Sequence, residues 1–374
     1  MEPLSFPFPC PQPGVAVDWS GVHFSWIAPM AECMQDPEYH AEGDVWTHTR
    51  MVCDRLVELP EWQSLDDTAR EVVFAAALLH DVSKPETTRE EDGHIRHPNH
   101  SLRGAMTTRR LLWELGVPFA LRERVTGLIR FHQAPFFLVD DRDSVRKAAR
   151  LSWVTRCDHL AILARADGLG RICADGQRIQ DNITLFEEFC REQGCLDRPW
   201  PFASDHSRYL YFRTEGRDPS YEAYDDTRGE AILMSGLPGA GKSHWVRENL
   251  EVPEISLDDI RAQLKLRPGE NSGEVFNRAR ERAREYLRAG TPFVWNATNL
   301  SRDLRGRVLD LFALYNPRIR IVYVESSFGR LMRQNRDRDA AVPAPVVERM
   351  LHAWDVPDRT EAHQVDYVIT ESGH

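Results

Sequence analysis

The chain has 374 residues, which is more than one typical hydrophobic core needs and predicts two domains. Its formal net charge of −11 argues against a basic surface that coats nucleic acid, although a few clustered Arg and Lys residues would suffice to hold a strand end. Seven scattered cysteines without zinc-finger spacing indicate reduced thiols. Met1–Val17 contains no Lys, Arg or long apolar run, so we expect no signal peptide, no membrane span and a cytoplasmic protein.

Helical periodicity dominates the sequence from Trp46 to Cys195. Apolar residues recur there at three- and four-residue intervals, and clusters of Gly, Pro, Asp and Asn separate the periodic segments. The predicted helices are Arg70–His80, Leu102–Leu115, Leu121–Phe131, Ser144–Leu169 and Arg178–Gln193. The pattern predicts an all-α helical bundle as the first domain, over residues 1–200.

His80 and Asp81 end a predicted helix that is apolar on every side. Two ionisable residues there are costly unless a partner such as a metal ion neutralises them. Further metal-capable side chains fall on inward faces of the bundle, namely His48, His100, His132 and Asp167. One such histidine alone is more often a core residue than a ligand, but the whole set predicts a metal site in the bundle core. Rival or supporting candidates are His40, His97, Asp158 and His159.

The order His … His-Asp … His … His … Asp resembles the HD phosphohydrolase superfamily. The resemblance implies one metal ion held by His48, His80, Asp81 and Asp167, and a second held by His100 and His132, with Asp81 between them. Lys84 matches a frequent phosphate-binding lysine of that superfamily. The choice of Asp167 over Asp158 rests on the ending Ala166-Asp167-Gly168-Leu169-Gly170.

Such a ligand set also indicates which ions to expect. Mixed His and carboxylate ligands suit Mn²⁺, Fe, Co²⁺, Ni²⁺ or Zn²⁺ better than Mg²⁺. A metal-bound water of lowered pKa would attack phosphorus, and the second ion with Lys84 would neutralise charge on the phosphoryl oxygens. The predicted activity of this half is metal-dependent phosphohydrolysis.

The second half of the chain shows a different pattern. Residues 201–229 are rich in aromatic, Asp and Arg residues with little periodicity and predict a packed linker. From residue 230 to 374, β-type runs at Ala231–Met234, Ile255, Phe293–Trp295, Ile319–Val324 and Tyr367–Ile369 alternate with helical segments. Those segments begin at Lys242 or span Phe276–Leu287 and Arg302–Leu314. The alternation predicts an α/β domain with a parallel sheet and helices on both faces.

The segment Gly236-Leu237-Pro238-Gly239-Ala240-Gly241-Lys242-Ser243 matches the P-loop pattern in full, between a predicted strand and a predicted helix. Backbone N–H groups of such a turn and the following helix N-terminus bind phosphate oxygens. We expect Lys242 to reach the β- and γ-phosphates of ATP or GTP, and the Ser243 hydroxyl to bind Mg²⁺. A glycine-rich turn without a ligand is the alternative, which the complete pattern disfavours.

Ser256-Leu257-Asp258-Asp259-Ile260-Arg261 follows the short strand at Ile255. Asp258 would there face the γ-phosphate and accept the proton of an attacking hydroxyl, but a helix N-terminus rich in Asp explains the same residues equally well. The segment resembles the strand-end motif of phage and bacterial polynucleotide 5′-kinases. The resemblance implies that Asp258 is the general base and that Arg261 contacts the acceptor phosphate and the reacting centre.

Two further segments are similar to that kinase family. Asn296-Ala297-Thr298-Asn299 resembles its turn after the next strand but lacks an acidic residue often found there, so Mg²⁺ would rest on Ser243 and, through water, on Asp258. Residues 330–338, followed by Val342-Pro343, resemble a helical lid whose arginines clamp the NTP phosphates, here Arg333, Arg336 and Arg338. Gln334 stands where the family commonly has Arg. An exposed charged helix face is the alternative for this segment.

An HD domain followed by a 5′-kinase is similar to the bacterial HD-Pnk family of RNA end-healing enzymes. The resemblance implies hydrolysis of 2′,3′-cyclic phosphate and 2′- or 3′-phosphate ends, and phosphorylation of 5′-hydroxyl ends, on RNA or DNA. An RNA ligase partner and a homo-oligomer are compatible with it. Two alternatives stay open: a nucleotide phosphohydrolase fused to a metabolite kinase, and a regulatory NTPase linked to a cyclic nucleotide.

Overall fold

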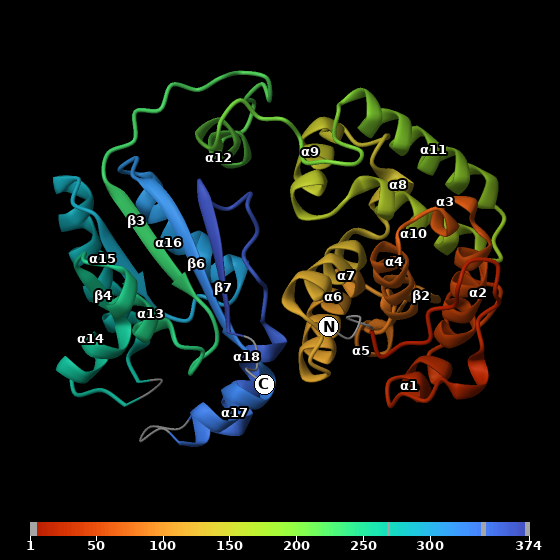
Figure 1. Ribbon diagram of the computed structural model, residues 1–374, viewed down its shortest axis with the longest axis horizontal. Coiled ribbons are helices and arrows are strands. Elements are labelled where there is room, and N and C mark those ends of the chain that lie inside the picture. Colours follow the sequence, from red (N-terminus) through yellow and green to blue (C-terminus); the bar gives the residue numbers. More distant parts are fainter. Residues whose placement is uncertain (1–5, 268–269, 338–341, 371–374) are drawn as a thin grey trace. The chain divides into compact units, whose positions relative to one another are not determined.

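The computed structural model describes residues 6–267, 270–337 and 342–370. The chain divides into two compact units, Met1–Pro201 and Phe202–His374, whose elements are labelled in Figure 1. In the described part of the chain, every helix is too short or too polar to cross a bilayer. The division lies at the start of the predicted linker, so that residues 202–229 belong to the second unit.

The first unit is built mainly from helices. Its longer helices are α2 (Val45–Glu58), α4 (Asp67–Leu79), α6 (His100–Glu114), α7 (Phe119–Phe131), α9 (Ser144–Val154), α10 (Cys157–Leu169) and α11 (Gly176–Glu192). Short helices are η1 (Trp19–Gly21), α1 (Ile27–Glu32), α3 (Pro60–Gln63), α5 (Lys84–Thr87) and α8 (Ala134–Phe137). Helix α4 is buried without a break from Val72 to Leu79 and contacts α2, α7 and α10, so it is the central helix of the bundle.

Two predictions for this unit are wrong in detail. The segment Ser144–Leu169 is two helices, because the backbone at Thr155 is extended. Gly127 of α7 packs closely against this break: a Cβ added at Gly127 would lie 3.1 Å from the carbonyl oxygen of Val154. The unit also contains an antiparallel hairpin, β1 (Arg89–Glu91) and β2 (His94–Arg96), and is therefore not all-α. Asp92 and Gly93 both have positive φ, as the tight Asp-Gly hairpin turn requires.

The second unit has a five-stranded sheet in the order β4-β5-β3-β6-β7, in which every pairing is parallel. Its strands are β3 (Glu230–Ser235), β4 (Glu254–Ser256), β5 (Phe293–Asn296), β6 (Arg318–Ser326) and β7 (Gln364–Thr370). The helices are α12 (Asp205–Arg213), α13 (Lys242–Asn249), α14 (Leu257–Gln263), α15 (Ser272–Ala289), α16 (Arg302–Ala313), α17 (Phe328–Arg336) and α18 (Ala344–His352). The predicted parallel α/β sheet is confirmed, while the predicted linker contains helix α12.

The strands of this sheet are apolar on both faces, as a covered parallel sheet requires. Leu233, Trp295 and Ile321 pack into one core cluster with residues of α15 and α16. The intervening residues Ile232 and Val322 are equally buried on the other face. Strand β3 lies at the centre of the sheet, so the glycine-rich loop that follows it emerges in the middle of the carboxyl edge, where ligands of open α/β sheets bind.

Candidate functional site

The six metal-capable residues predicted in the first unit meet in its interior. Each is at most 7% exposed, and they come from the first turn of α2, the end of α4, the start of α6, the end of α7 and the last turn of α10. Ligand atoms of His48, His80 and Asp81 lie within 4.8 Å of one another, and so do those of Asp81, His100 and His132. Asp81 belongs to both groups and therefore occupies the centre of the cluster.

Hydrogen bonds to the backbone fix three of the imidazole rings. The Nδ1 atoms of His80, His100 and His132 donate to the carbonyl oxygens of Ala77, His97 and Ile129, at 2.7, 2.7 and 2.8 Å. A neutral ring that donates through Nδ1 leaves the lone pair of Nε2 free. These Nε2 atoms lie 3.2, 3.5 and 3.9 Å from carboxylate oxygens of Asp81, so three lone pairs converge on one carboxylate.

The cluster contains buried polar atoms that fit a cation. His100 Nε2 and His132 Nε2 are 3.4 Å apart, and in this tautomer neither carries a proton to share. His80 Nε2 and both oxygens of Asp81 make no well-aligned hydrogen bond within the described part of the chain, although Lys84 Nζ lies 2.7 Å from Asp81 Oδ2. Buried polar atoms are normally satisfied, so a donor set of this kind fits one or two metal ions.

The protonation states also suit metal binding. Burial alone would raise the pKa of Asp81, but His80 and Lys84 hold it well below its ordinary value. Asp167 is likewise held low by Arg171 and His48 against the effect of burial. Burial lowers the pKa of His132 to about 3 and also lowers that of His100, which keeps these two rings neutral, whereas Asp81 raises the pKa of His80 against the effect of burial. Ionised carboxylates and neutral imidazoles are the forms that bind metals.

Lys84, which the sequence singled out, lies beside the cluster together with two residues that it did not. Lys84 is 3% exposed and donates to Gln35 Oε1 at 2.6 Å as well as pairing with Asp81. Arg171 donates two hydrogen bonds of 2.9 Å to Asp167. Glu42 lies 2.9 Å from His48 Nδ1. Glu42 lies in a loop and Arg171 beyond the end of α10, where periodicity carries no signal.

Of the rival candidates, Asp158 and His159 lie elsewhere in the first unit, whereas His40 and His97 border the cluster beside His48 and His100. Asp158 pairs with Arg156 at the opposite end of α10 from Asp167, and His159 is beside it. His40 pairs with Glu42 at 2.7 Å, and His97 Nδ1 lies 3.1 Å from the Thr88 hydroxyl. In the described residues, the convergent groups around Asp81 therefore contain neither Asp158 nor His159.

The P-loop of the second unit has the backbone that its glycines allow. Gly236, Gly239 and Gly241 have φ of 141°, 83° and 103°, and an added Cβ at Gly236 would lie 2.2 Å from the carbonyl oxygen of Val324. Gly241 caps helix α13, whose first residue is Lys242. The Lys242 ammonium donates to the carbonyl oxygens of Gly236 and Leu237 at 2.8 and 2.9 Å. It is thus held at the loop that surrounds phosphates.

A carboxylate that the sequence did not predict reaches the P-loop serine through an amide. Asn296, the last residue of β5, donates from Nδ2 to Ser243 Oγ at 3.0 Å and to Glu254 Oε1 at 2.6 Å. Strands β4 and β5 pair side by side, which brings Glu254 next to this asparagine. The 296–299 turn has no acidic residue of its own, but Glu254 on the adjacent strand places a carboxylate next to it.

Asp258 and Arg261 occupy the first turns of α14. The Ser256 hydroxyl caps this helix by accepting from the Asp259 backbone N–H at 3.1 Å. The side chain of Asp258 is 89% exposed, and its Oδ1 lies 2.9 Å from Arg261 Nη1. An exposed carboxylate on a capped helix is compatible both with a proton acceptor and with an ordinary helix N-terminus.

Helix α17 is the element predicted as the lid, and it carries Arg333 and Arg336. The side-chain amide of Gln334 hydrogen-bonds to two neighbours. Its Nε2 donates to the Gly239 carbonyl of the P-loop at 2.8 Å, and its Oε1 accepts from Arg330 Nε at 3.3 Å. The lid helix therefore contacts the phosphate loop directly. Arg338, the third predicted lid arginine, lies outside the described residues.

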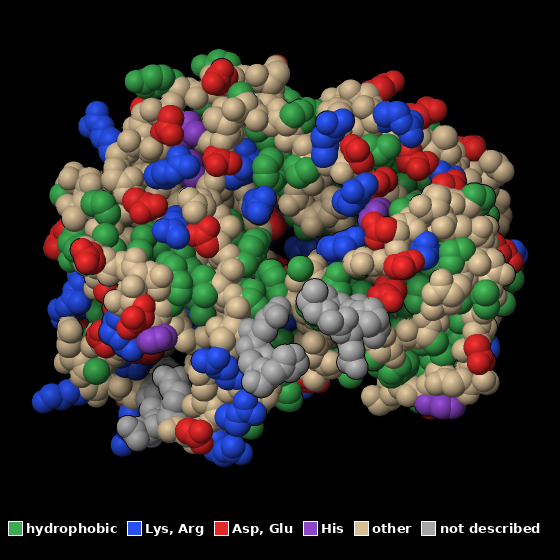
Figure 2. Space-filling model, viewed as in Figure 1, with side chains coloured by type: hydrophobic (Ala, Val, Ile, Leu, Met, Phe, Trp, Pro, Cys, Tyr) green, Lys and Arg blue, Asp and Glu red, His purple; other side chains and the backbone are tan. Residues whose placement is uncertain are grey.

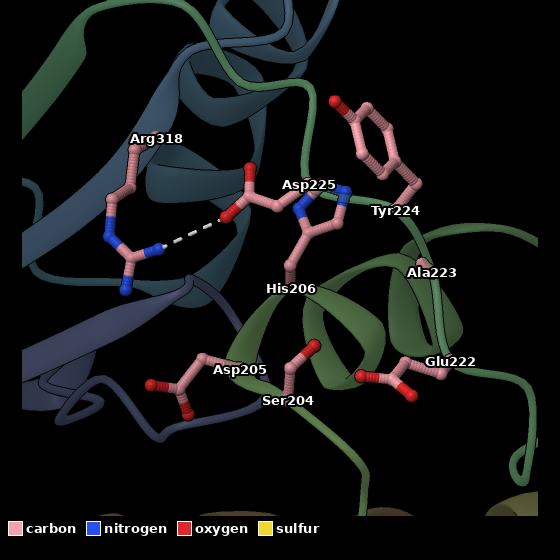
Figure 3. Close-up of a pocket in the computed structure, with 8 residues that line it drawn as sticks. All are labelled: Ser204, Asp205, His206, Glu222, Ala223, Tyr224, Asp225 and Arg318. Atoms are coloured by element: carbon pink, nitrogen blue, oxygen red, sulfur yellow. Dashed lines mark ion pairs between the residues drawn. The ribbon is translucent and has the colours of Figure 1, made fainter.

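The second unit also has a cavity of about 590 Å³ lined by Asp205, His206, Tyr224, Asp225 and Arg318 among others (Figure 3). It lies where β6 begins, at the opposite edge of the sheet from the P-loop, and contains none of the predicted residues. On the face in Figure 2, Lys and Arg side chains are interspersed with Asp and Glu. We assign no role to this cavity.

Comparison with known proteins finds a family match within the second unit. The AAA_33 family model, described as an AAA domain, matches residues 232–357, which include the P-loop and helices α13 to α18. A putative kinase from Chloroflexus aurantiacus is similar to 38% of this chain over 86% of its own, with 19% identity and a TM-score of 0.33. The second unit thus contains a P-loop domain that matches the AAA_33 model.

Curated relatives match shorter parts of the chain. A multifunctional CCA protein of Halorhodospira halophila is 37% identical over 98 residues, which are 26% of this chain and 21% of the relative. A CC-adding tRNA nucleotidyltransferase of Thermus thermophilus is 32% identical over 158 residues, which are 42% of this chain and 33% of the relative. The chain therefore spans a third or less of the length of these two relatives.

Proposed function

We propose that this chain is a bifunctional nucleic-acid end-healing enzyme. Its first unit would hydrolyse 2′,3′-cyclic phosphate and 2′- or 3′-phosphate ends, and its second unit would phosphorylate 5′-hydroxyl ends. The observation that carries the proposal is that one chain holds both a metal-ligand cluster around Asp81 and a complete P-loop, each in its own unit. Together the two reactions convert the ends left by RNA cleavage into ends that a ligase joins.

In the first unit, His48, His80, Asp81 and Asp167 would hold one metal ion, and Asp81, His100 and His132 a second. When bound, such ions activate water at neutral pH and offset charge on the phosphoryl oxygens. The ionised Asp81 supplies a negative charge to both sites. Lys84 would turn its ammonium from Asp81 and Gln35 toward a phosphoryl oxygen, which adds a positive charge where negative charge develops.

In the second unit, the backbone N–H groups of the P-loop and Lys242 would bind the β- and γ-phosphates of the NTP. The 5′-hydroxyl oxygen attacks the γ-phosphorus while Asp258 accepts the hydroxyl proton, and the nucleoside diphosphate leaves. Ser243 would hold Mg²⁺, with Glu254 as the nearby carboxylate that Asn296 keeps in place. Arg333 and Arg336 of the lid, together with Arg338, would neutralise the phosphates.

An RNA end is favoured over a free nucleotide by one comparison. A relative of this chain is named for its action on tRNA, which supports an RNA substrate here. The exposed position of Asp258 also leaves room for a large acceptor. A nucleotide phosphohydrolase fused to a metabolite kinase remains the second candidate, because an exposed base would also serve a small acceptor.

One RNA oligonucleotide tests both halves of the proposal. It carries a 5′-hydroxyl and a 2′,3′-cyclic phosphate, and it is incubated with ATP or GTP, Mg²⁺ and Mn²⁺ while both ends are followed. We expect a phosphate to appear at the 5′ end and the cyclic phosphate to open and be removed. Inert RNA ends combined with rapid turnover of 3′-mononucleotides would instead establish the metabolite-enzyme alternative.

A further inference from the structure

Glu42 lies in the loop before α2 and belongs to no sequence motif, yet its side chain is only 1% exposed. Its Oε1 lies 2.9 Å from His48 Nδ1 and 2.7 Å from His40 Nδ1. Its Oε2 accepts the backbone N–H of Ile172 at 2.9 Å. A buried carboxylate with two hydrogen-bond partners and a third nitrogen in close contact is held in one orientation, whereas a surface carboxylate is free to rotate.

The contact with Glu42 decides which nitrogen of His48 is free. An ionised carboxylate only accepts hydrogen bonds, so the proton of His48 is placed on Nδ1. The lone pair of Nε2 then points to the other side of the ring, where Asp167 Oδ1 lies at 3.2 Å and Asp81 Oδ2 at 3.9 Å. The Glu42–His48 contact is a close approach of charge and ring rather than an aligned hydrogen bond, because His48 Nδ1 has no well-aligned partner among the described residues, whereas His40 Nδ1 has one.

Both carboxylate oxygens of Glu42 face donors: Oε2 accepts the Ile172 N–H, and Oε1 lies 2.7 Å from His40 Nδ1. His48 thus differs from the other three imidazoles of the cluster, whose Nδ1 atoms donate to neutral backbone carbonyls. A carboxylate partner binds the ring more strongly and makes the opposite nitrogen more basic.

The same segment also orients Asp167. Ile172, whose N–H holds Glu42, directly follows Arg171, which makes two hydrogen bonds to Asp167. The Ala41 N–H donates in turn to the Ile172 carbonyl at 2.9 Å, which fastens the loop before α2 to the segment after α10. His48 and Asp167, the first and last ligands along the chain, are therefore positioned by one connected structure.

We propose that Glu42 is a positioning residue of the metal centre, which sets the tautomer of His48 and presents its Nε2 to the ion. This role rests on the metal site of the proposed function. His40, Glu42 and His48 also have ligand atoms within 4.8 Å of one another, so Glu42 could itself be a ligand. Glu42 contacts His48 on the Nδ1 side of the ring, away from the Nε2 that faces Asp81 and Asp167, which favours the positioning role.

Metal titration of Glu42→Gln separates these roles. The full-length metal-free protein is titrated with Mn²⁺ without nucleotide, and free Mn²⁺ is followed by electron paramagnetic resonance to obtain both the stoichiometry and the dissociation constant. We expect an unchanged number of ions and a dissociation constant raised about 10- to 100-fold, the usual effect of losing such a partner. Glu32→Gln, the same change at an exposed residue at the end of α1, should bind like the unaltered protein.

Other outcomes overturn the proposal in distinguishable ways. An unchanged dissociation constant in Glu42→Gln would show that His48 needs no carboxylate partner. Loss of one whole ion would make Glu42 a ligand. No Mn²⁺ binding by the unaltered protein would refute the proposed metal centre, and this role with it. If Glu42→Gln does not fold, judged by circular dichroism, Glu42→Asp keeps the charge and should weaken binding less than tenfold.

Discussion

Single side chains decide the chemistry of both sites through their hydrogen-bond partners. In the first unit, backbone carbonyls fix three imidazole rings and a carboxylate faces the fourth. In the second, one asparagine joins the P-loop serine to a glutamate on the adjacent strand. Residue types alone therefore name the ligands, while the partners determine their protonation and direction.

The role of Asp258 is open to a direct test. Asp258→Ala should lower the rate of 5′-phosphorylation about 10²- to 10⁴-fold, because no base then accepts the hydroxyl proton. Asp259→Ala is the matched control, since its side chain is also exposed in the first turn of α14, and it should keep most of the activity. Steady-state kinetics on the RNA oligonucleotide measure both. If Asp258→Ala kept full turnover, Asp258 would not be the general base, and its role would be limited to the N-terminus of α14.

Gly236 is required by the backbone of the P-loop. Gly236→Ala should abolish 5′-kinase activity and destabilise the second unit, because its Cβ would lie 2.2 Å from the Val324 carbonyl oxygen at a φ of 141°. Gly306→Ala in α16 meets open space and should stabilise the unit by about 0.5–1 kcal/mol, as alanine does in helices. Denaturant unfolding and kinase assays compare the two. An active Gly236→Ala enzyme would contradict this loop geometry.

Elements are held together by a few buried ion pairs as well as by apolar packing. Arg305 of α16 is fully buried and makes two bonds of 2.8 Å to Glu361, in the segment before β7. It also donates to the backbone carbonyls of Leu300 and Asp355. One guanidinium thus ties α16 to the chain that leads into the edge strand.

Removing that guanidinium should destabilise the second unit strongly. Arg305→Met leaves Glu361 and several carbonyls buried with fewer partners, and breaking such a pair costs about 3–5 kcal/mol. Arg307→Met removes an arginine that is 67% exposed and should change the free energy of unfolding by less than about 1 kcal/mol. Urea titrations give both values, and equal effects would show that the buried pair contributes little.

The contact between α6 and α7 should be sensitive to acid. Burial alone would raise the pKa of Glu123, but Arg109 and Arg122 hold this pKa at about 2, below the ordinary 4.5. A depressed folded pKa means that the stabilisation is complete above about pH 4.5 and is lost as the pH falls toward 2. The stability difference between the unaltered protein and Glu123→Gln should therefore shrink over that range. Glu58→Gln, at a residue 64% exposed, should show no such trend in pH-dependent unfolding.

At the scale of the whole molecule, the two sites are separate and should fail separately. Lys242→Ala should abolish 5′-kinase activity and spare the phosphohydrolase, and Asp81→Ala should do the reverse, because the residues lie in different units. A transition-metal chelator, followed by Mg²⁺ and ATP, should likewise stop only the 3′-end reaction. Assays of both ends on one RNA measure this. Loss of both activities from either change would indicate one coupled site or a folding defect.

The sequence by itself determined the parallel α/β half, the P-loop and the central helix that ends at His80-Asp81. Local sequence patterns encode these features, namely apolar runs, the spacing of glycines and helical periodicity. It did not show the hairpin over Arg89–Arg96 or the break at Thr155, where a turn and a glycine contact outweigh helical periodicity.

Only the tertiary structure brought the six predicted ligands into one cluster and supplied their partners. Glu42 and Ile172 are far apart in the chain and share a hydrogen bond, and Glu254 meets Asn296 because two strands pair. No local pattern encodes such contacts, since they depend on which helices and strands become neighbours. Sequence therefore indicates the candidate ligands, and packing decides how their side chains are oriented and which hydrogen-bond partners they have.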